Sequence, residues 1–227
     1  MAQVTTGFEF SNLSGRPPGR FVAVAARLSR GIRSVQEQTA PYAAAWLRDK
    51  TAALAAAGPL WVALGDSMTV GIGASTHRRG WVGQLAARMP GWRVLNLGIS
   101  GGRVRDVLDR QLPALEQLGI TPDLVTLLIG NNDLMNPRYR PALPADHAEL
   151  LERLPAGTLV GNQPGTYAAA LEFNRQIDEA VGSGVVRLAE LRDPRTRHWK
   201  GKLAADHFHP NDRGYAGIAE IFGESLP

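Results

Sequence analysis

Short apolar runs that alternate with helical patterns are the feature that most constrains how this chain of 227 residues can fold. The clearest run spans residues 124–129, with others at 60–64 and 93–97 and weaker ones at 158–160 and 185–188. A continuous apolar run is typical of a strand that is buried on both faces. Strands separated by helices predict a mostly parallel sheet with helices on both sides. The helices are expected over residues 81–89, 104–118, 146–154, 167–181 and 212–222.

The part of the chain before the first strand differs in character from the rest. Residues 1–20 mix small polar residues with a Pro-Pro-Gly breaker, which predicts a flexible tail. Apolar residues at helical spacing predict one helix over 21–35, and an alanine-rich pattern predicts a second over 42–57. We therefore divide the chain into an N-terminal tail and helical extension, residues 1–57, and a main domain, residues 58–227.

The excess positive charge of the chain lies entirely in the extension. Residues 1–57 carry seven Lys or Arg and three Asp or Glu, whereas residues 58–227 carry 18 of each kind. The main domain is therefore neutral overall, which argues against a nucleic-acid partner. The basic helix over 21–35 is expected to pack its apolar face on the domain, and contact with a membrane surface through this helix is the alternative.

Cysteine is absent from the sequence, which excludes disulfide bonds, thiolate-bound zinc and a catalytic thiol. The N-terminus lacks the pattern of a secretory signal. No apolar stretch reaches the length that a membrane-spanning helix needs. These observations lead us to expect a cytoplasmic protein and leave its oligomeric state open.

Four polar blocks lie where a parallel sheet would gather functional residues. The first strand runs into Gly-Asp-Ser-Met at 65–68, the second into Gly-Ile-Ser-Gly-Gly at 98–102, and the third into Gly-Asn-Asn-Asp at 130–133. A fourth block, Asp-His-Phe-His-Pro at 206–210, precedes the last helix. Functional residues of such sheets gather beyond the carboxyl ends of the strands. The topology therefore predicts that the four blocks meet at one edge.

Together the blocks contain the groups that an acyl-transfer reaction needs. Ser67 requires a neighbouring base to become a nucleophile, and His209 is the natural base. Asp206, three residues before His209, can orient the imidazole ring and stabilise its charged form. The backbone N–H groups of Ser67 and Gly101 and the side-chain amide of Asn132 can bind the developing oxyanion.

In order and composition the four blocks resemble those of the SGNH hydrolases, also called GDSL-type esterases and lipases. The Gly-Asp-Ser block matches the family's nucleophile at Ser67, and the glycine-rich turn matches its oxyanion glycine at Gly101. The third block matches at Asn132, and Asp-x-x-His-Pro matches at Asp206 and His209.

The resemblance covers residues 60–227, with Met68 where leucine is frequent and a second asparagine at Asn131 as departures. It implies a flavodoxin-like α/β/α sandwich with a five-stranded, mainly parallel sheet. It also implies hydrolysis of a carboxylic ester through an acyl-enzyme on Ser67, without a metal or a cofactor. The partner would be a small-molecule ester or an acylated lipid or sugar, and the fold does not select among these.

Other residues near the blocks are expected to play supporting roles. Gly102 is the alternative to Gly101 as the oxyanion donor. Trp199 and residues 134–157 are candidates for lining the substrate mouth. Structural or solvent-exposed positions are expected for Asn131, Asp66, Asp133 and His207.

Two other functions stay open at this point. A metal-dependent phosphoesterase would also carry a Gly-Asn-x-Asp block, but this chain lacks the Asp-x-His and Gly-His-x-His blocks that would accompany it. A non-catalytic carbohydrate- or lipid-binding module on the same fold is the second alternative. The complete set of reactive groups argues against such a module.

Overall fold

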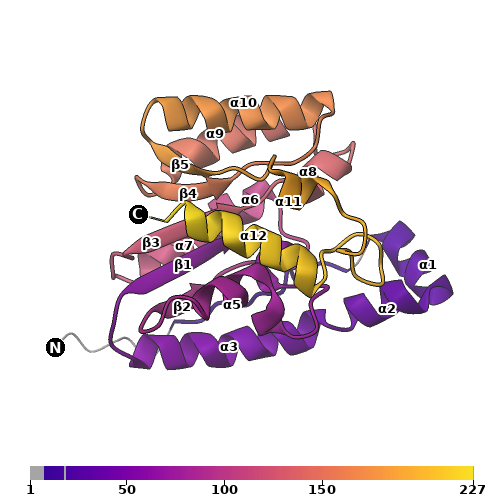
Figure 1. Ribbon diagram of the computed structural model, residues 1–227, viewed down its shortest axis with the longest axis horizontal. Helices are drawn as coiled ribbons and strands as arrows, with labels where there is room; N and C mark the ends of the chain where they lie inside the picture. The colour runs from indigo at the N-terminus through magenta and orange to yellow at the C-terminus, as the bar shows by residue number, and fades with distance from the viewer. Residues whose placement is uncertain (1–7, 18, 227) are drawn as a thin grey trace.

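One parallel sheet of five strands forms the centre of the computed structural model, which describes residues 8–17 and 19–226. The strands lie in the order β2-β1-β3-β4-β5 (Figure 1). Each neighbouring pair is parallel, so all five carboxyl ends lie at the same edge. The strands are β1 (Leu60–Gly65), β2 (Arg93–Asn96), β3 (Leu124–Leu128), β4 (Thr158–Gly161) and β5 (Val186–Ala189). The predicted five-stranded parallel sheet is confirmed.

The side chains of β1 explain why its sequence is apolar throughout. Leu60, Val62 and Leu64 enter one hydrophobic core. Trp61 and Ala63 point the other way and enter a second core on the opposite face. All six residues of β1 are buried, because both faces of the sheet are covered.

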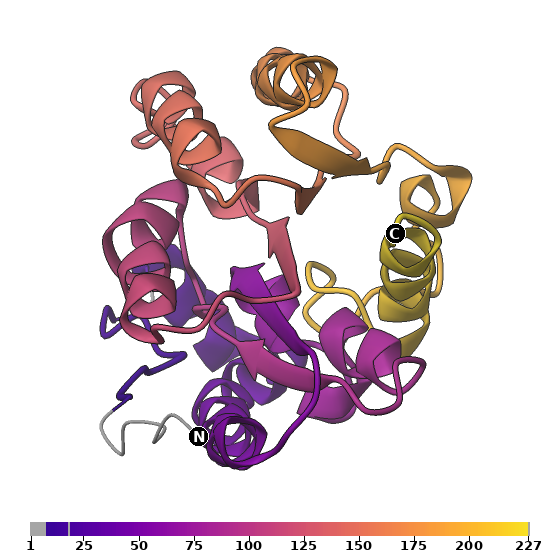
Figure 2. The same cartoon turned by 90° about the vertical axis from the view of Figure 1, so that its left-hand side faces the viewer.

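Helices cover the two faces of the sheet and complete three layers (Figure 2). One face carries α6 (Val104–Asp106), the π-helical segment η2 (Val107–Gln111), α7 (Leu112–Gln117), α9 (Leu143–Arg153) and α10 (Ala168–Gly182). The other face carries α5 (Trp81–Ala86) and α12 (Asp212–Glu224). The short helices of the loops are α4 (Ser67–Val70), η1 (His77–Arg79), α8 (Asn131–Met135) and α11 (Pro194–Arg197). Across the described residues, no helix combines the length and apolar character that crossing a bilayer requires.

The N-terminal extension packs on the sheet domain through its last helix. Its helices are α1 (Arg20–Leu28), α2 (Arg30–Gln36) and α3 (Thr39–Ala55). The third helix lies against β2 at the edge of the sheet and buries Trp46. The single helix predicted over 21–35 is instead two helices, because Ser29 interrupts it. The hydroxyl of Ser29 accepts the N–H of Ile32 at 3.3 Å and so caps α2.

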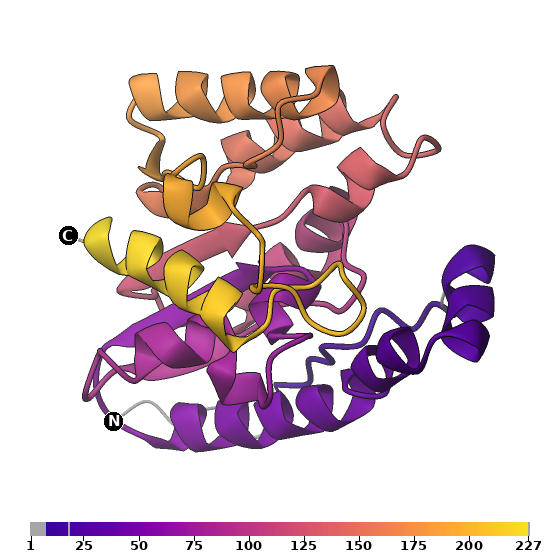
Figure 3. The same cartoon turned by 45° about the vertical axis from the view of Figure 1, so that its right-hand side comes forward.

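The apolar face predicted over 21–35 packs on the domain only in part. Val35 in α2 is buried, whereas Val24 is 54% exposed and Leu28 is 86% exposed. Both exposed residues belong to α1, which projects from the body of the protein (Figure 3). The expectation that the whole face packs on the domain is therefore wrong for the described side chains of α1.

Residues 8–17 form an extended segment on the domain, which we call the strap. Figure 3 shows this segment, in indigo, running beside α3 toward α1. The buried amide of Asn12 donates to the carbonyl oxygens of Asn96 and Gly98, at 3.0 Å and 2.6 Å. The strap thus belongs to the folded body, in contrast to the flexible tail predicted over 1–20. The first seven residues of that tail lie outside the described part of the chain.

Candidate active site

The candidate nucleophile Ser67 lies in the turn that connects β1 to α4. Asp66 caps the helix, since its carboxylate accepts the N–H of Met68 at 2.9 Å. Gly65 enters the turn with a φ of +147°, and a Cβ at this position would collide with the backbone of β3. Only glycine fits there, so the geometry of the turn requires the first residue of the Gly-Asp-Ser block. The turn leaves Ser67 only 6% exposed.

A buried glutamine that the sequence analysis missed holds the backbone of this turn. Gln111 accepts the N–H of Gly65 and donates to the carbonyl oxygen of Gly65, both at 2.8 Å. It ends the π-helical segment η2, and π-helical turns are frequent at functional sites. The pattern over 104–118 predicted a regular α-helix. A glutamine among the apolar residues of that pattern was the available signal.

Asp206 and His209 approach Ser67 from the loop before α12. The Oγ of Ser67 lies 3.0 Å from Nε2 of His209, and Nδ1 of His209 lies 2.6 Å from Oδ2 of Asp206. The other carboxylate oxygen of Asp206 accepts the N–H groups of Phe208 and His209, each at 3.0 Å. Burial raises the pKa of Asp206, but these hydrogen bonds outweigh it and hold the pKa below its usual value. The structure therefore brings the three predicted residues into one hydrogen-bonded chain.

The predicted oxyanion donors come from the turns after β1, β2 and β3. The N–H groups of Ser67 and Gly101 have no hydrogen-bond acceptor among the residues that the structure describes. The amide of Asn132 donates to the carbonyl oxygen of Gly102 at 2.8 Å, which fixes its orientation. Gly102 itself donates its N–H to Ile99 at 2.7 Å, so this N–H is already engaged. The geometry thus favours Gly101 over its alternative Gly102.

Two buried carboxyl groups lie in the same turns as the reactive residues. Burial raises the pKa of Asp66 to about 7, and repulsion from Asp133 adds to the effect. Burial also raises the pKa of Asp133 to about 6. Asp133 accepts the N–H of Val104 at 3.1 Å and so holds the first residue of α6. Asp66 thus holds the N-terminus of α4 and Asp133 that of α6, which is consistent with the structural positions expected for them.

The loop after α4 lies against His209, and the N-terminal extension holds that loop. A Cβ on Gly73 would lie 2.7 Å from the Cβ of His209, so the two residues are in close contact. Gln38, just before α3, accepts the N–H of Gly73 at 2.7 Å and donates to the carbonyl of Ala74 at 3.1 Å. The hydroxyl of Tyr42 donates to the same carbonyl at 2.7 Å. Support for the site therefore comes from a segment that the sequence division put outside the main domain.

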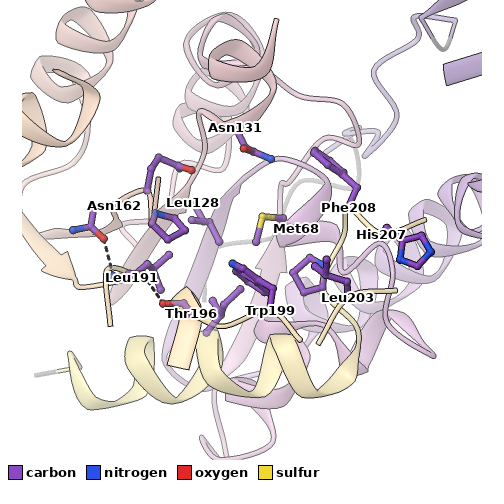
Figure 4. A pocket seen from close by; sticks show the side chains of 14 residues that line it. Met68, Leu128, Asn131, Asn162, Leu191, Thr196, Trp199, Leu203, His207 and Phe208 are labelled. Atoms are coloured by element: carbon purple, nitrogen blue, oxygen red, sulfur yellow. Dashed lines mark hydrogen bonds between the residues drawn. The ribbon is translucent and has the colours of Figure 1, made fainter. Parts of the chain in front are cut away.

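A cavity of about 260 Å³ opens beside the nucleophile (Figure 4). Met68, the neighbour of Ser67, lies in its lining between Asn131 and Trp199. Trp199 was predicted at the substrate mouth and does line this cavity, and so does Asn131, for which we expected a purely structural role. Residues 134–157 contribute nothing to the lining, so that expectation is wrong for this cavity. The apolar lining is completed by Leu128, Leu191, Leu203, Phe208, Pro210 and Ile218.

The remaining histidine near the site is His207, which lines the cavity but lies outside the hydrogen-bonded chain of Ser67, His209 and Asp206. His207 is exposed, as expected, and has a positive φ of 56°. Residues 8–17 and 19–226 include no group of three or more His, Cys, Asp or Glu side chains that could hold a metal ion.

Proteins of known family and structure resemble this chain over the sheet domain. The sequence model of the GDSL-like Lipase/Acylhydrolase family matches residues 63–216. No curated protein matches the chain in sequence. Among solved structures, LAE5, described as an alpha/beta hydrolase enzyme from the metagenome of Lake Arreo, Spain, is 25% identical. Its TM-score is 0.59, over 75% of this chain and 95% of LAE5.

Two further solved structures share the fold at lower identity. TesA is 23% identical, with a TM-score of 0.60 over 74% of this chain and 97% of its own. The Clostridium thermocellum family 3 carbohydrate esterase is 18% identical, with a TM-score of 0.59 over 74% of this chain and 95% of its own. The family match starts inside β1, ends inside α12 and so covers more than half of the chain. By that match the chain belongs to the GDSL-like lipase/acylhydrolase family of hydrolases.

Proposed function

We propose that this hydrolase cleaves a carboxylic ester through an acyl-enzyme on Ser67. The observation that carries the proposal is the chain of hydrogen bonds from Ser67 through His209 to Asp206, with distances of 3.0 Å and 2.6 Å. A serine hydroxyl at this distance from an imidazole nitrogen can transfer its proton as it attacks. Membership of the family supports the same chemistry.

The proposed reaction has two halves that use the same groups. Ser67 Oγ attacks the carbonyl carbon, and its proton moves to Nε2 of His209. The tetrahedral oxyanion is held by the N–H groups of Ser67 and Gly101 and by the amide of Asn132. His209 then gives its proton to the leaving alkoxide, and the acyl group stays on Ser67. Water then attacks the acyl carbon and gives a proton to His209. The bond between the acyl carbon and Ser67 Oγ breaks, His209 returns the proton to Ser67, and the acid is released.

Asp206 contributes by fixing the ring of His209. Its carboxylate accepts the Nδ1–H of His209, so Nε2 is the nitrogen that faces Ser67. Its pKa lies below the usual value, so the carboxylate is charged when the imidazolium forms. That charge stabilises the imidazolium.

The cavity supports an ester with an apolar group as the substrate. Its lining is mainly apolar, and it begins at Met68, directly after the nucleophile. The Clostridium thermocellum structure is a carbohydrate esterase, so acetylated sugars belong in the same assay as alkyl esters.

The test is the hydrolysis of p-nitrophenyl esters from acetate to palmitate, with and without a chelator. Ser67→Ala is expected to lose turnover on every ester, because no other group can form the acyl-enzyme. Ser183→Ala, at the exposed end of α10, is the matched serine control and should keep the wild-type rate. Turnover that persists in Ser67→Ala would remove the proposal, and loss of activity with the chelator would favour a metal-dependent phosphoesterase-like reaction instead.

A further inference from the structure

The turn that carries the proposed oxyanion donor Gly101 contains two consecutive glycines. Gly101 has a φ of +71°, and nothing lies within 4 Å of the place where its Cβ would be. Neither packing nor a side chain of its own therefore fixes this residue. Glycine has more conformational freedom than other residues, whereas an oxyanion donor is effective only when it is held in place. The contacts that hold this turn consequently matter for the proposed reaction.

The strap supplies contacts on both sides of the Gly101 N–H. Leu13 and Ser100 form a parallel β-bridge, in which Ser100 donates its N–H to the carbonyl oxygen of Asn12 at 2.9 Å. Beyond the bridge, the guanidinium of Arg16 donates to the carbonyl oxygen of Gly101 at 3.0 Å. The peptide groups Ile99–Ser100 and Gly101–Gly102, on either side of the peptide that carries the Gly101 N–H, are thus both tied to one segment.

Arg16 is itself held by a buried carboxylate. Its two terminal nitrogens donate to the two oxygens of Asp106, each at 2.7 Å. Asp106 is 5% exposed and also accepts the N–H of Arg103 at 2.8 Å, so it is anchored at the start of α6. A planar guanidinium can bind both carboxylate oxygens and still reach a third acceptor, which an ammonium group cannot do in the same geometry.

We propose that Arg16 is a positioning residue for the oxyanion hole: clamped on Asp106, it holds the Gly101 carbonyl and thereby keeps the Gly101 N–H directed at the reacting oxygen. The inference rests on the proposed ester hydrolysis. Arg16 lies outside the part of the chain that matches the family, residues 63–216. In this protein the hydrolase site is therefore completed by a residue that the family pattern does not include.

The test compares Arg16→Gln with Arg110→Gln in the full chain. Arg110 donates to the carbonyl oxygens of Leu13 and Ser14 in the same strap, at 3.0 Å and 3.3 Å, and lies 4.0 Å from the Asp106 carboxylate. Within the described residues it has no hydrogen bond to Gly101. Arg16→Gln is expected to lower kcat about tenfold with KM within about twofold, less than the loss from removing an oxyanion donor outright. Labelling of Ser67 by a p-nitrophenyl phosphonate should slow in proportion, and Arg110→Gln should change neither rate.

A second pair of variants separates positioning from stability. Arg16→Gln removes the bidentate partner of the buried Asp106 carboxylate, which keeps only the longer contacts to Arg103 at 3.8 Å and Arg110 at 4.0 Å, and so destabilises the fold. Arg16→Gln/Asp106→Asn removes that charge, and it should regain the melting temperature while kcat stays low. Millimolar guanidinium should restore part of the kcat of Arg16→Ala.

The kcat values of these variants decide whether Arg16 positions the oxyanion hole. Full kcat in the folded double variant, or equal losses in Arg16→Gln and Arg110→Gln, would overturn the role of Arg16. A different result would contradict the proposed function itself: the wild-type protein would hydrolyse no ester and would not be labelled at Ser67.

Discussion

Adjacent asparagines in the turn after β3 have different surroundings and should have different effects on catalysis. Asn132 is fixed by its hydrogen bond to Gly102, whereas Asn131 lines the cavity. Asn132→Ala is expected to lower kcat roughly 10²–10³-fold, because an oxyanion donor acts in the transition state. Asn131→Ala should mainly change KM. Steady-state kinetics of the two variants on one ester would check this, and an equal loss of kcat in both would contradict it.

The buried carboxyl group of Asp66 makes stability depend on pH. Its pKa is about 7 in the folded chain against a usual value of 3.8, so folding favours the protonated form. That contribution is fully present below about pH 4 and is lost as the pH rises toward 7, because only the unfolded chain readily loses the proton in this window.

Asp66→Asn removes this titration and keeps an acceptor for the N–H of Met68. Relative to wild type, its free energy of unfolding should rise by a few kcal/mol between pH 4 and pH 7.5, since one pKa unit corresponds to about 1.4 kcal/mol. Urea unfolding at several pH values gives the difference directly. A constant difference across this range would show that Asp66 does not titrate there.

Single functional residues could be identified from the sequence where a polar block lay at the position at which the predicted sheet gathers functional residues. Ser67, Asp206 and His209 were predicted because a parallel sheet gathers such turns at one edge and the blocks resemble those of one family. The structure places the three side chains in hydrogen-bonding contact. Gln111 and Arg16 could not be found in this way. Their partners, Gly65 and Gly101, lie 46 and 85 positions away, and no local pattern encodes such a contact.

At the scale of elements, the cavity between the sheet and α12 should set the preferred acyl length. A water molecule occupies about 30 Å³ and a methylene group is of similar size, so 260 Å³ admits an apolar chain of about eight carbons. We expect kcat/KM to rise from acetate to octanoate and to fall for palmitate. A maximum at palmitate would mean that the chain lies elsewhere.

Ile218 on α12 offers a direct test of the cavity, since its side chain lines it. Ile218→Phe should lower kcat/KM for octanoate much more than for acetate, because the larger ring occupies space that only the longer chain uses. Val82 is a matched control, because it is equally buried in the core on this face of the sheet but does not line the cavity. Val82→Leu should leave the ratio of the two esters unchanged.

The strands followed from their apolar runs, because burial on both faces leaves a continuous signal in the sequence. The elements before the first strand did not follow so directly. Ser29 ends one helix and caps the next, which periodicity over 21–35 does not reveal. The strap has little secondary structure of its own, and its composition is that of a free tail. Only its contacts with the glycine-rich turn show that it is part of the folded body.

For the whole molecule, the extension and the sheet domain behave as parts of one folded body. α3 covers the β2 edge, and the Trp46 indole donates to the carbonyl oxygen of Val70 at 2.8 Å. A chain that starts at Gly58 would expose this edge and leave the loop beside His209 without Gln38 and Tyr42. We expect such a chain to lose cooperative thermal unfolding or to melt at a much lower temperature. Unchanged melting by circular dichroism would mean that the main domain is self-sufficient.

Gly73 contacts His209, and Gln38 binds the loop that carries Gly73. The parts of the site therefore come from segments that are synthesised at different times. Synthesis delivers the N-terminal segment well before the His209 loop. Gln38 and α3, which hold the Gly73 loop, therefore leave the ribosome long before the His209 loop exists. Until the His209 loop has been made, a nascent chain lacks the base that we propose for the reaction, so it should not hydrolyse esters.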